Sequence, residues 1–254
     1  MIKIENVMTV GWEPAIRGMR NPKNSWDRSD TLFFDYACDD DDVVCHDVLK
    51  HIHRIKPSDW SDDIFRGLRI GQNDMKLMKS LVAGGPVHAK FRRMIVVYVD
   101  ITAPLYWWHD MDIYKVGIVK NSCSTKHKIH AKTFEESDFS TDHTGSAHGT
   151  LLNVIDILNI ARNRFLDTKG KAHWYAMQSV LPWCYNQKAT MMFNYEVLAN
   201  IYHSRKDHKL DEFREFCKWI ETLPYAKELI IGETIEDFPT SPLLDPKYNG
   251  GECE

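Results

Sequence analysis

The chain has 254 residues, a formal net charge of −4 and a hydrophobic fraction of 43%, which allows one large domain or two small ones. So small a net charge creates no global field favouring nucleic acid or a membrane surface as a partner. No apolar run approaches the roughly 18 residues that a bilayer-spanning helix needs, and the N-terminus lacks the basic-then-apolar order of a secretory signal. We therefore expect a cytoplasmic protein that binds neither nucleic acid nor membrane.

The cysteines and the acidic run do not predict a metal site. None of the six cysteines forms a CxxC pair, so a structural zinc or dithiol redox site is not expected, and the thiols should be free in a reducing compartment. The four aspartates at 39–42 precede apolar residues at helical spacing, which predicts the first turn of a helix. A metal-binding run of carboxylates is the alternative, but we expect no metal.

A helix and a buried strand are predicted next. Asn73 is placed to cap a helix, and the Gly-Gly-Pro at 84–86 ends it. The near-continuous apolar stretch Met94–Val99, inside RRMIVVYVDIT, predicts a strand that is buried on both faces. A second helix is predicted to begin near Pro104 with the aromatic run LYWW, and a polar connector containing NSCSTKH follows it.

The C-terminal half is predicted to be mostly helical. Apolar residues recur at helical spacing in 151–165, 188–205 and 209–223. Residues 236–254 are polar and rich in Pro and Gly, which is typical of a loose tail. The order of elements predicts an α+β fold in which helix dominates.

Basic and polar side chains gather at three places, and anion recognition is the chemistry they share. The first two are VHAKFRRM before the strand and the connector at 112–128; the third is the C-terminal set Lys188, Asn194, Arg205 and Arg214. Arginine pairs with phosphate through forked donors, lysine adds a point charge, and hydroxyls can complete a cradle. The alternative is a solvated basic surface, with Ser and Asn side chains that only serve turns and caps.

The order of these pieces resembles the flavin-dependent thymidylate synthases. In that family a Gly-rich turn leads to a motif like GHxSPFEH, where this chain has GGPVHAKFRR. The buried strand that ends in Ala-Pro corresponds to RRMIVVYVDITAP. An aromatic-rich helix then runs into the family signature RHRxxSxNExSxRY, where this chain has IYKVGIVKNSCSTKH.

The match inside the signature is partial. The tripeptide 113–115, Ile-Tyr-Lys, stands where the family has Arg-His-Arg. Asn121 and Ser124 keep the Asn and Ser of the family, whereas Ser122 stands at its glutamate. The isoleucine in the first of these positions can donate no hydrogen bond from its side chain, so contacts with flavin and nucleotide would have to shift.

The C-terminal half carries a second line of resemblance. The family has Leu-Pro, then a helix with an Asn, an Arg and an AQxEIR-like turn. This chain has Leu181-Pro182, Asn194, Arg205 and LDEFR, which ends at Arg214. The resemblance places the first of these arginines at a flavin contact and the second at a nucleotide phosphate.

The resemblance implies a flavin-dependent thymidylate synthase-like domain, α+β and helix-dominated with a central buried sheet. It divides the chain into a divergent N-terminal part of the same domain at 1–65, the core at 66–235 and the loose tail at 236–254. It also implies a homotetramer in which the sites lie between subunits.

The implied reaction is the reductive methylation of dUMP, a pyrimidine nucleotide, to dTMP, with FAD as the cofactor and NADPH and methylenetetrahydrofolate as co-substrates. The implied catalytic residues are Ser124 and Lys115. The implied cofactor-binding residues are His88, Arg92, Arg93, Tyr114, Asn121, Asn194 and Arg205. The implied substrate-binding residues are Gln187, Lys188, Ser122, Ser124 and Arg214.

Three alternatives to that function remain open from the sequence. Cys123 could act as a thiol nucleophile. The chain could carry out related one-carbon chemistry on another pyrimidine nucleotide. It could also be a catalytically degenerate nucleotide-binding or structural homo-oligomer that keeps the fold.

Overall fold

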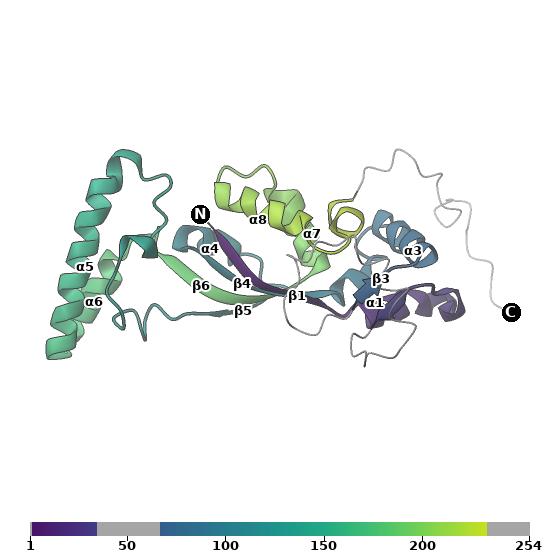
Figure 1. Cartoon of the computed structure of the whole chain (residues 1–254), viewed down its shortest axis with the longest axis horizontal. Coiled ribbons are helices and arrows are strands. Elements are labelled where there is room, and N and C mark those ends of the chain that lie inside the picture. The colour runs from purple at the N-terminus through teal and green to yellow at the C-terminus, as the bar shows by residue number, and fades with distance from the viewer. Residues whose placement is uncertain (1, 35–66, 233–254) are drawn as a thin grey trace, which may run out of the picture. The chain divides into compact units, whose positions relative to one another are not determined.

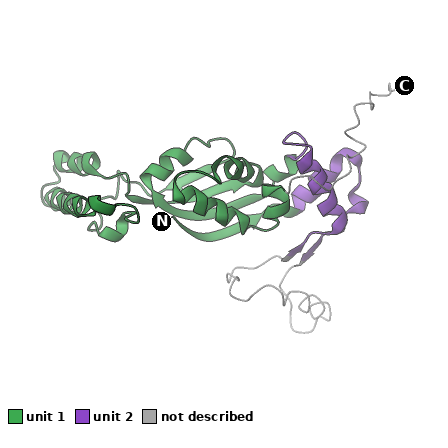
Figure 2. Ribbon diagram, turned by 90° about the horizontal axis from the view of Figure 1, so that it is seen from above, with its two compact units in different colours: residues 1–12, 90–238 green, residues 13–89, 239–254 purple. Residues whose placement is uncertain are grey.

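The computed structural model describes residues 2–34 and 67–232 (Figure 1). These residues belong to two compact units, one of residues 1–12 and 90–238 and the other of residues 13–89 and 239–254 (Figure 2). Within the described ranges, no helix combines the length and the apolar character needed to cross a membrane.

Some sequence predictions concern residues outside these ranges. They include the helix that follows the aspartates at 39–42 and the loose tail at 236–254. The predicted domain boundaries after residues 65 and 235 also border undescribed residues, so they stay predictions.

The first unit is built on a four-stranded antiparallel sheet with the order β1-β4-β6-β5. Its strands are β1 (Lys3–Val10), β4 (Val96–Pro104), β5 (Val119–Ser122) and β6 (Asn186–Asn194). The central pair, β4 and β6, runs from Val96 opposite Asn194 to Pro104 opposite Asn186. Both edges of the sheet, β1 and β5, have a strand neighbour on one side only.

The strand predicted at RRMIVVYVDIT is confirmed, but its burial on both faces is wrong. Along β4 the side chains of Val97 and Val99 are buried, whereas Tyr98 between them is 39% exposed. Met94, just before the strand, is also exposed. The alternation follows from the pleat, which sends successive side chains to opposite faces, and only one face of this antiparallel sheet is covered by helices of the described chain.

The covering helices are α4 (Leu105–Met111), α7 (Tyr195–Arg205) and α8 (Asp211–Glu221) (Figure 1). Aromatic rings form the core beneath them. The Trp107 ring lies 5.4 Å from Phe213 and 5.6 Å from Phe216, and Phe216 lies 5.8 Å from Phe193 of the sheet, measured between centroids. The helices predicted after Pro104 and at 209–223 are therefore confirmed.

The single helix predicted at 188–205 is wrong, because its first part is the end of β6. Ala189, Met191 and Phe193 are buried with period two, so the strand places Met192 on the opposite face. The helix starts only at Tyr195. The adjacent apolar pair Met191 and Met192 fits a helical stripe as well as a strand, so the sequence did not reveal the strand period.

A helical hairpin completes the first unit. It consists of α5 (His148–Thr168) and α6 (Lys171–Val180), and it confirms the helix predicted at 151–165. The two helices pack on each other around a second core. Its buried members are Ile129, Phe134, Phe139, Leu151, Ile155, Leu158, Ala161 and Met177.

The second unit contains α1 (Trp12–Arg20) apart from its first residue, the antiparallel pair β2 (Leu32–Phe34) and β3 (Gly67–Arg69), and α3 (Gln72–Ala83). The helix predicted near 73–83 is confirmed, but Asn73 does not cap it. The backbone N–H of Asn73 instead donates to the Asp30 carboxylate at 2.9 Å, and the N–H of Asp74 donates to the same carboxylate at 3.1 Å. The helix start is thus held by a side chain 43 positions earlier.

Short helical turns connect these elements. They are η1 (Asn21–Lys23), η2 (Trp26–Arg28), η4 (Lys90–Arg93), η5 (Glu136–Asp138), η6 (Gly145–Ala147) and the π-turn η7 (Lys227–Ile231). The fold class is α+β, dominated by helix with a small antiparallel sheet, as predicted.

Candidate functional site

Arg92, an expected cofactor ligand, lies inside the protein. Its Nε donates to Glu196 Oε2 at 2.8 Å, one terminal nitrogen lies 2.6 Å from the same oxygen, and the other donates to the Leu229 carbonyl at 3.0 Å. All three guanidinium nitrogens have internal partners, so the geometry assigns Arg92 to holding η4 against α7. A cofactor contact has no support in this geometry. Arg93 and His88 are exposed, the latter in the second unit.

The connector NSCSTKH is only partly a loop. Asn121 and Ser122 are the last residues of β5, and the Cys123 N–H extends the ladder by donating to the Lys188 carbonyl at 2.8 Å. The Gln187 amide donates to the Cys123 carbonyl at 2.7 Å. Four predicted site residues and the cysteine thus meet along β5 and the start of β6.

Ser124 forms a local turn. Its Oγ accepts the backbone N–H groups of Lys126 and His127, both at 3.1 Å, and lies 2.8 Å from His127 Nδ1. Because the two N–H groups use its acceptor positions, its own proton is directed to the imidazole. This is the turn-forming role that the alternative interpretation gave to such hydroxyls.

Lys188 belongs to a polar network on the uncovered face of the sheet. Its Nζ lies 3.1 Å from Asp100 Oδ2 and 3.7 Å from Glu5 Oε2. Asp100 also accepts hydrogen bonds from Thr190 at 2.6 Å and Asn6 at 2.9 Å. These hydrogen bonds, of which the one from Thr190 has the largest effect, lower the pKa of Asp100 to about 2. The negative charge of Asp100 is therefore stabilised by partners within the protein.

Tyr114 and Arg205, both expected cofactor ligands, lie in direct contact. Arg205 Nε donates to the Tyr114 hydroxyl at 2.9 Å, and that hydroxyl lies 2.8 Å from Ser204 Oγ. The guanidinium carbon sits 4.9 Å from the centroid of the Phe213 ring. A cation fixed between two aromatic rings is pre-organised for planar or anionic ligands.

Arg214 lies in the first turn of α8, close to His208, which was not among the predicted site residues. It forms an ion pair with Asp211 and donates to the His208 carbonyl at 2.6 Å. His208 Nδ1 accepts the Leu210 N–H at 3.3 Å, so neutral His208 carries its proton on Nε2. Burial first, and then the charge of Arg205, lower the pKa of His208, which favours that neutral form.

Asn194 lies at the start of α7, and Lys115 lies in the loop before β5. Asn194 is the N-cap of α7, and its Oδ1 accepts the Val197 N–H at 3.0 Å. Gly117 has φ +78°, and a Cβ there would approach Asn194 Nδ2 to 2.8 Å, so the loop packs closely on the cap. Lys115 is exposed in this loop.

The predicted site residues therefore fall into separate sets. Tyr114, Asn194 and Arg205 lie on α7, at its N-cap and in the loop before β5, whereas the residues of β5 and the start of β6 form another set. Among the described residues no hydrogen bond or ion pair joins Ser124 to Arg214.

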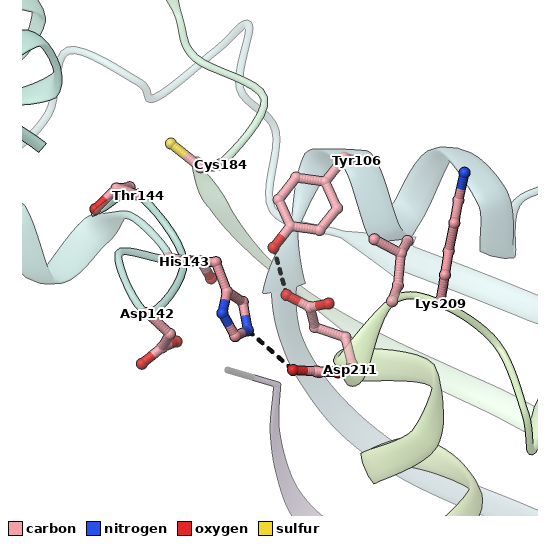
Figure 3. A pocket seen from close by; sticks show the side chains of 10 residues that line it. Tyr106, Asp142, His143, Thr144, Cys184, Lys209 and Asp211 are labelled. Atoms are coloured by element: carbon pink, nitrogen blue, oxygen red, sulfur yellow. Dashed lines mark hydrogen bonds and ion pairs between the residues drawn. The ribbon is translucent and has the colours of Figure 1, made fainter. Parts of the chain in front are cut away.

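A cavity of about 500 Å³ opens at the N-terminal end of α8 (Figure 3). The Tyr106 hydroxyl donates to the Glu212 carboxylate in a short contact, and His143 Nε2 lies 3.1 Å from Asp211 Oδ2. Burial first, and then Glu212, raise the pKa of Tyr106. None of these four side chains was predicted from the sequence as a site residue.

One signal could have pointed to Glu212. It precedes Phe216 and Ile220 by four and eight residues, which places an acidic residue on the buried stripe of α8. Within residues 2–34 and 67–232, no three His, Cys, Asp or Glu residues gather as metal ligands would.

No known protein family and no curated protein matches the chain by sequence. Its fold is nevertheless similar to two crystal structures of the flavin-dependent thymidylate synthase ThyX from Helicobacter pylori, both with FAD and dUMP. One has a TM-score of 0.55 and 14% identity, over 89% of this chain and 98% of the other. The second has a TM-score of 0.56 and 13% identity, over 91% and 97%. The predicted thymidylate synthase-like fold is thereby confirmed, and at this identity the likeness concerns the fold alone.

Proposed function

We propose that this protein binds FAD and a pyrimidine nucleotide and reductively methylates dUMP to dTMP, with methylenetetrahydrofolate as the one-carbon donor and NADPH as the reductant. The observation that carries the proposal is the fold shared over 89% of the chain with a thymidylate synthase whose structure holds FAD and dUMP. The pairing of Tyr114 with Arg205 supports it, because both were expected at the cofactor.

The residues at the turn between α7 and α8 fit a phosphorylated ligand. The Arg214–Asp211 pair is exposed, with 44% and 41% of the side chains accessible. Exposed ion pairs contribute little stability, so Arg214 can exchange this carboxylate for a phosphate. Arg205 would hold the FAD together with Tyr114 and Asn194.

The residues of β5 and β6 would approach the nucleotide from another subunit of a homotetramer. Asn121, Ser122 and Gln187 offer amide and hydroxyl groups there, and Ser124 and Lys188 are close in sequence. Lys115 would add positive charge at the pyrimidine carbonyls. The flavin, when bound, supplies the hydride chemistry, and the protein supplies binding and orientation.

Nucleotide binding without catalysis is the second candidate. Ile113 stands where the family resemblance expects an arginine and is 63% exposed. Arg92 is used internally, and the Ser124 hydroxyl is engaged in its own turn. These features remove polar contacts from a flavin site while leaving the cations of α7 and α8 in place.

The absorbance spectrum of the purified protein, with identification of any released ligand, tests the first candidate. Flavin bands together with a higher melting temperature in dUMP support the proposed enzyme. A colourless protein that dUMP still stabilises supports the second candidate. Absence of both colour and dUMP stabilisation refutes both.

Arg214→Ala tests the phosphate contact directly. We expect dUMP affinity to fall about tenfold or more, because a charge-assisted contact is lost. The matched control is Lys218→Ala, which removes another exposed charge from α8. Equal dUMP affinity in both variants would reject the role given to Arg214.

A further inference from the structure

Helix α5 has apolar residues on two sides, and only one side is covered. The covered side carries residues of the second core, among them Leu151, Ile155 and Leu158. Ile157 and Ile160 lie on the other side, where their side chains are 50% and 53% exposed. Because residues three positions apart share one helix face, α5 (Figure 1) presents an apolar patch that the described chain leaves uncovered.

The two isoleucines are the centre of a longer stripe with heptad spacing. From them towards both ends of the helix, residues separated alternately by three and four positions share this face. All six residues of the stripe are exposed, and they are Thr150, Asn153, Ile157, Ile160, Arg164 and Asp167. The apolar centre is thus enclosed by polar residues at both ends, an order that fits the packing of one helix on another.

The charges on this face have no ionic partner in the described chain. Asp156, which flanks the stripe beside Ile157, and Arg164 are both exposed. Neither forms an ion pair with any residue of 2–34 or 67–232. The two lie roughly 12 Å apart along the helix axis, so they do not neutralise each other within one copy. A matching surface would place a cation opposite Asp156 and an acceptor opposite Arg164, and a second copy of α5 carries both.

The same charges decide the direction in which two copies of α5 would pack. In a parallel pair each residue of the stripe faces its own counterpart, so Arg164 would meet the partner's Arg164, which is unfavourable. In an antiparallel pair with a two-fold axis between the isoleucines, Ile157 faces the partner's Ile160. Arg164 then faces the partner's Asn153 and comes beside the partner's Asp156, and the symmetry repeats each contact.

We propose that two copies of this chain associate by antiparallel packing of α5 on α5. The isoleucines form the centre of the interface, and Arg164 of each copy pairs with Asp156 and Asn153 of the other copy. Because the surface is complementary to itself, the contact closes on two copies. The proposal goes beyond the proposed function, which places β5 and β6, and not α5, beside another subunit.

Sedimentation equilibrium of the full chain tests the apolar centre. The wild type should assemble, and Ile160→Glu should halve the assembled mass and raise the dissociation constant about a hundredfold, since two carboxylates would be buried without partners. Leu152→Glu is the matched control, because Leu152 is 39% exposed on the same helix but lies outside the stripe. That variant should keep the wild-type mass. A monomeric wild type, or the same mass for both variants, would overturn the proposal.

Charge exchange tests the pairing of Arg164 with Asp156. Both side chains are exposed, so Asp156→Arg and Arg164→Asp should leave the fold intact. Each variant alone places like charges opposite each other and should weaken its assembly about tenfold or more at low salt.

An equal mixture of the two charge variants should regain the wild-type affinity. In the mixed pair the new arginine faces the new aspartate, and the unchanged Arg164 faces the unchanged Asp156. A mixture that stays as dissociated as its two components would overturn the antiparallel pairing.

The α5 interface and the proposed function can fail separately. Absence of dUMP binding to the wild type would refute the proposed function and leave the sedimentation results standing. An Ile160→Glu variant with the wild-type mass would overturn the α5 interface, whatever its affinity for dUMP.

Discussion

Replacement of Arg92 by leucine should strongly destabilise the protein while leaving any flavin site unchanged. The side chains of Arg92 and Glu196 are each 8% exposed, and their guanidinium and carboxylate groups meet at 2.6 Å. Arg92→Leu leaves the Glu196 charge buried without a partner, a change that typically costs about 3–5 kcal/mol of unfolding free energy. It also removes the donor of the Leu229 carbonyl, which lies 3.0 Å from Arg92.

Urea unfolding followed by circular dichroism measures the effect. Arg93→Leu is the matched control, because its side chain is exposed on the same short turn, and its change should stay within about 0.5 kcal/mol. The double variant Arg92→Leu/Glu196→Leu removes both charges and should recover much of the loss, which would appear as a coupling energy of about 2 kcal/mol or more.

Three outcomes would contradict the role of the buried Arg92–Glu196 ion pair or its coupling energy. If Arg92→Leu unfolds at the same urea concentration as Arg93→Leu, the ion pair is not what holds η4 to α7. If Arg92→Leu instead lowers flavin affinity at unchanged stability, Arg92 is a cofactor ligand, as the family resemblance implied. A double variant no more stable than Arg92→Leu would contradict the coupling.

Three further changes test local features. Asn194→Ala should lower the unfolding free energy by about 1 kcal/mol through loss of the cap of α7, and Asn194→Asp, which keeps the acceptor, should not; equal losses in urea unfolding would contradict the cap. Gly117→Ala should cost more than about 1 kcal/mol in the same assay, because φ is +78° and the added Cβ meets the Asn194 amide at 2.8 Å; a neutral result would contradict the close packing. Hydrogen bonds, that from Thr190 first, hold the pKa of Asp100 at about 2, below its ordinary 3.8, so its charged form stabilises the fold above about pH 4, and this stabilisation is lost as the pH falls towards 2. Asp100→Asn should therefore cost about 1 kcal/mol at neutral pH and progressively less below pH 4, whereas a pH-independent cost would reject the electrostatic origin.

Where a local period was long and unambiguous, the sequence predicted the element. The helix within 151–165 repeats its apolar residues over four turns, and α5 contains all of it. In 188–205 the run from Ala189 to Phe193 fits both a helix stripe and a strand alternation, since short apolar runs carry both periods. Its pairing with β4 along nine residues decides for the strand.

The site depended still more on contacts between distant parts of the chain. Separate basic residues could be marked from the sequence, and Tyr114 with Arg205 does meet as one pair. No local spacing in the sequence could predict two of the contacts. Arg92 pairs with Glu196, which lies 104 positions later. Tyr106 donates to Glu212, which lies 106 positions later.

The sequence by itself thus determined the helical segments with clear periodicity, the strand at RRMIVVYVDIT but not its one-sided burial, and the thymidylate synthase-like order of elements. Only the tertiary structure decided which charges are neutralised inside and which strand pairs with which. The physical reason is that periodicity reports which side of an element faces the core, whereas the partner of a polar group is chosen by three-dimensional proximity.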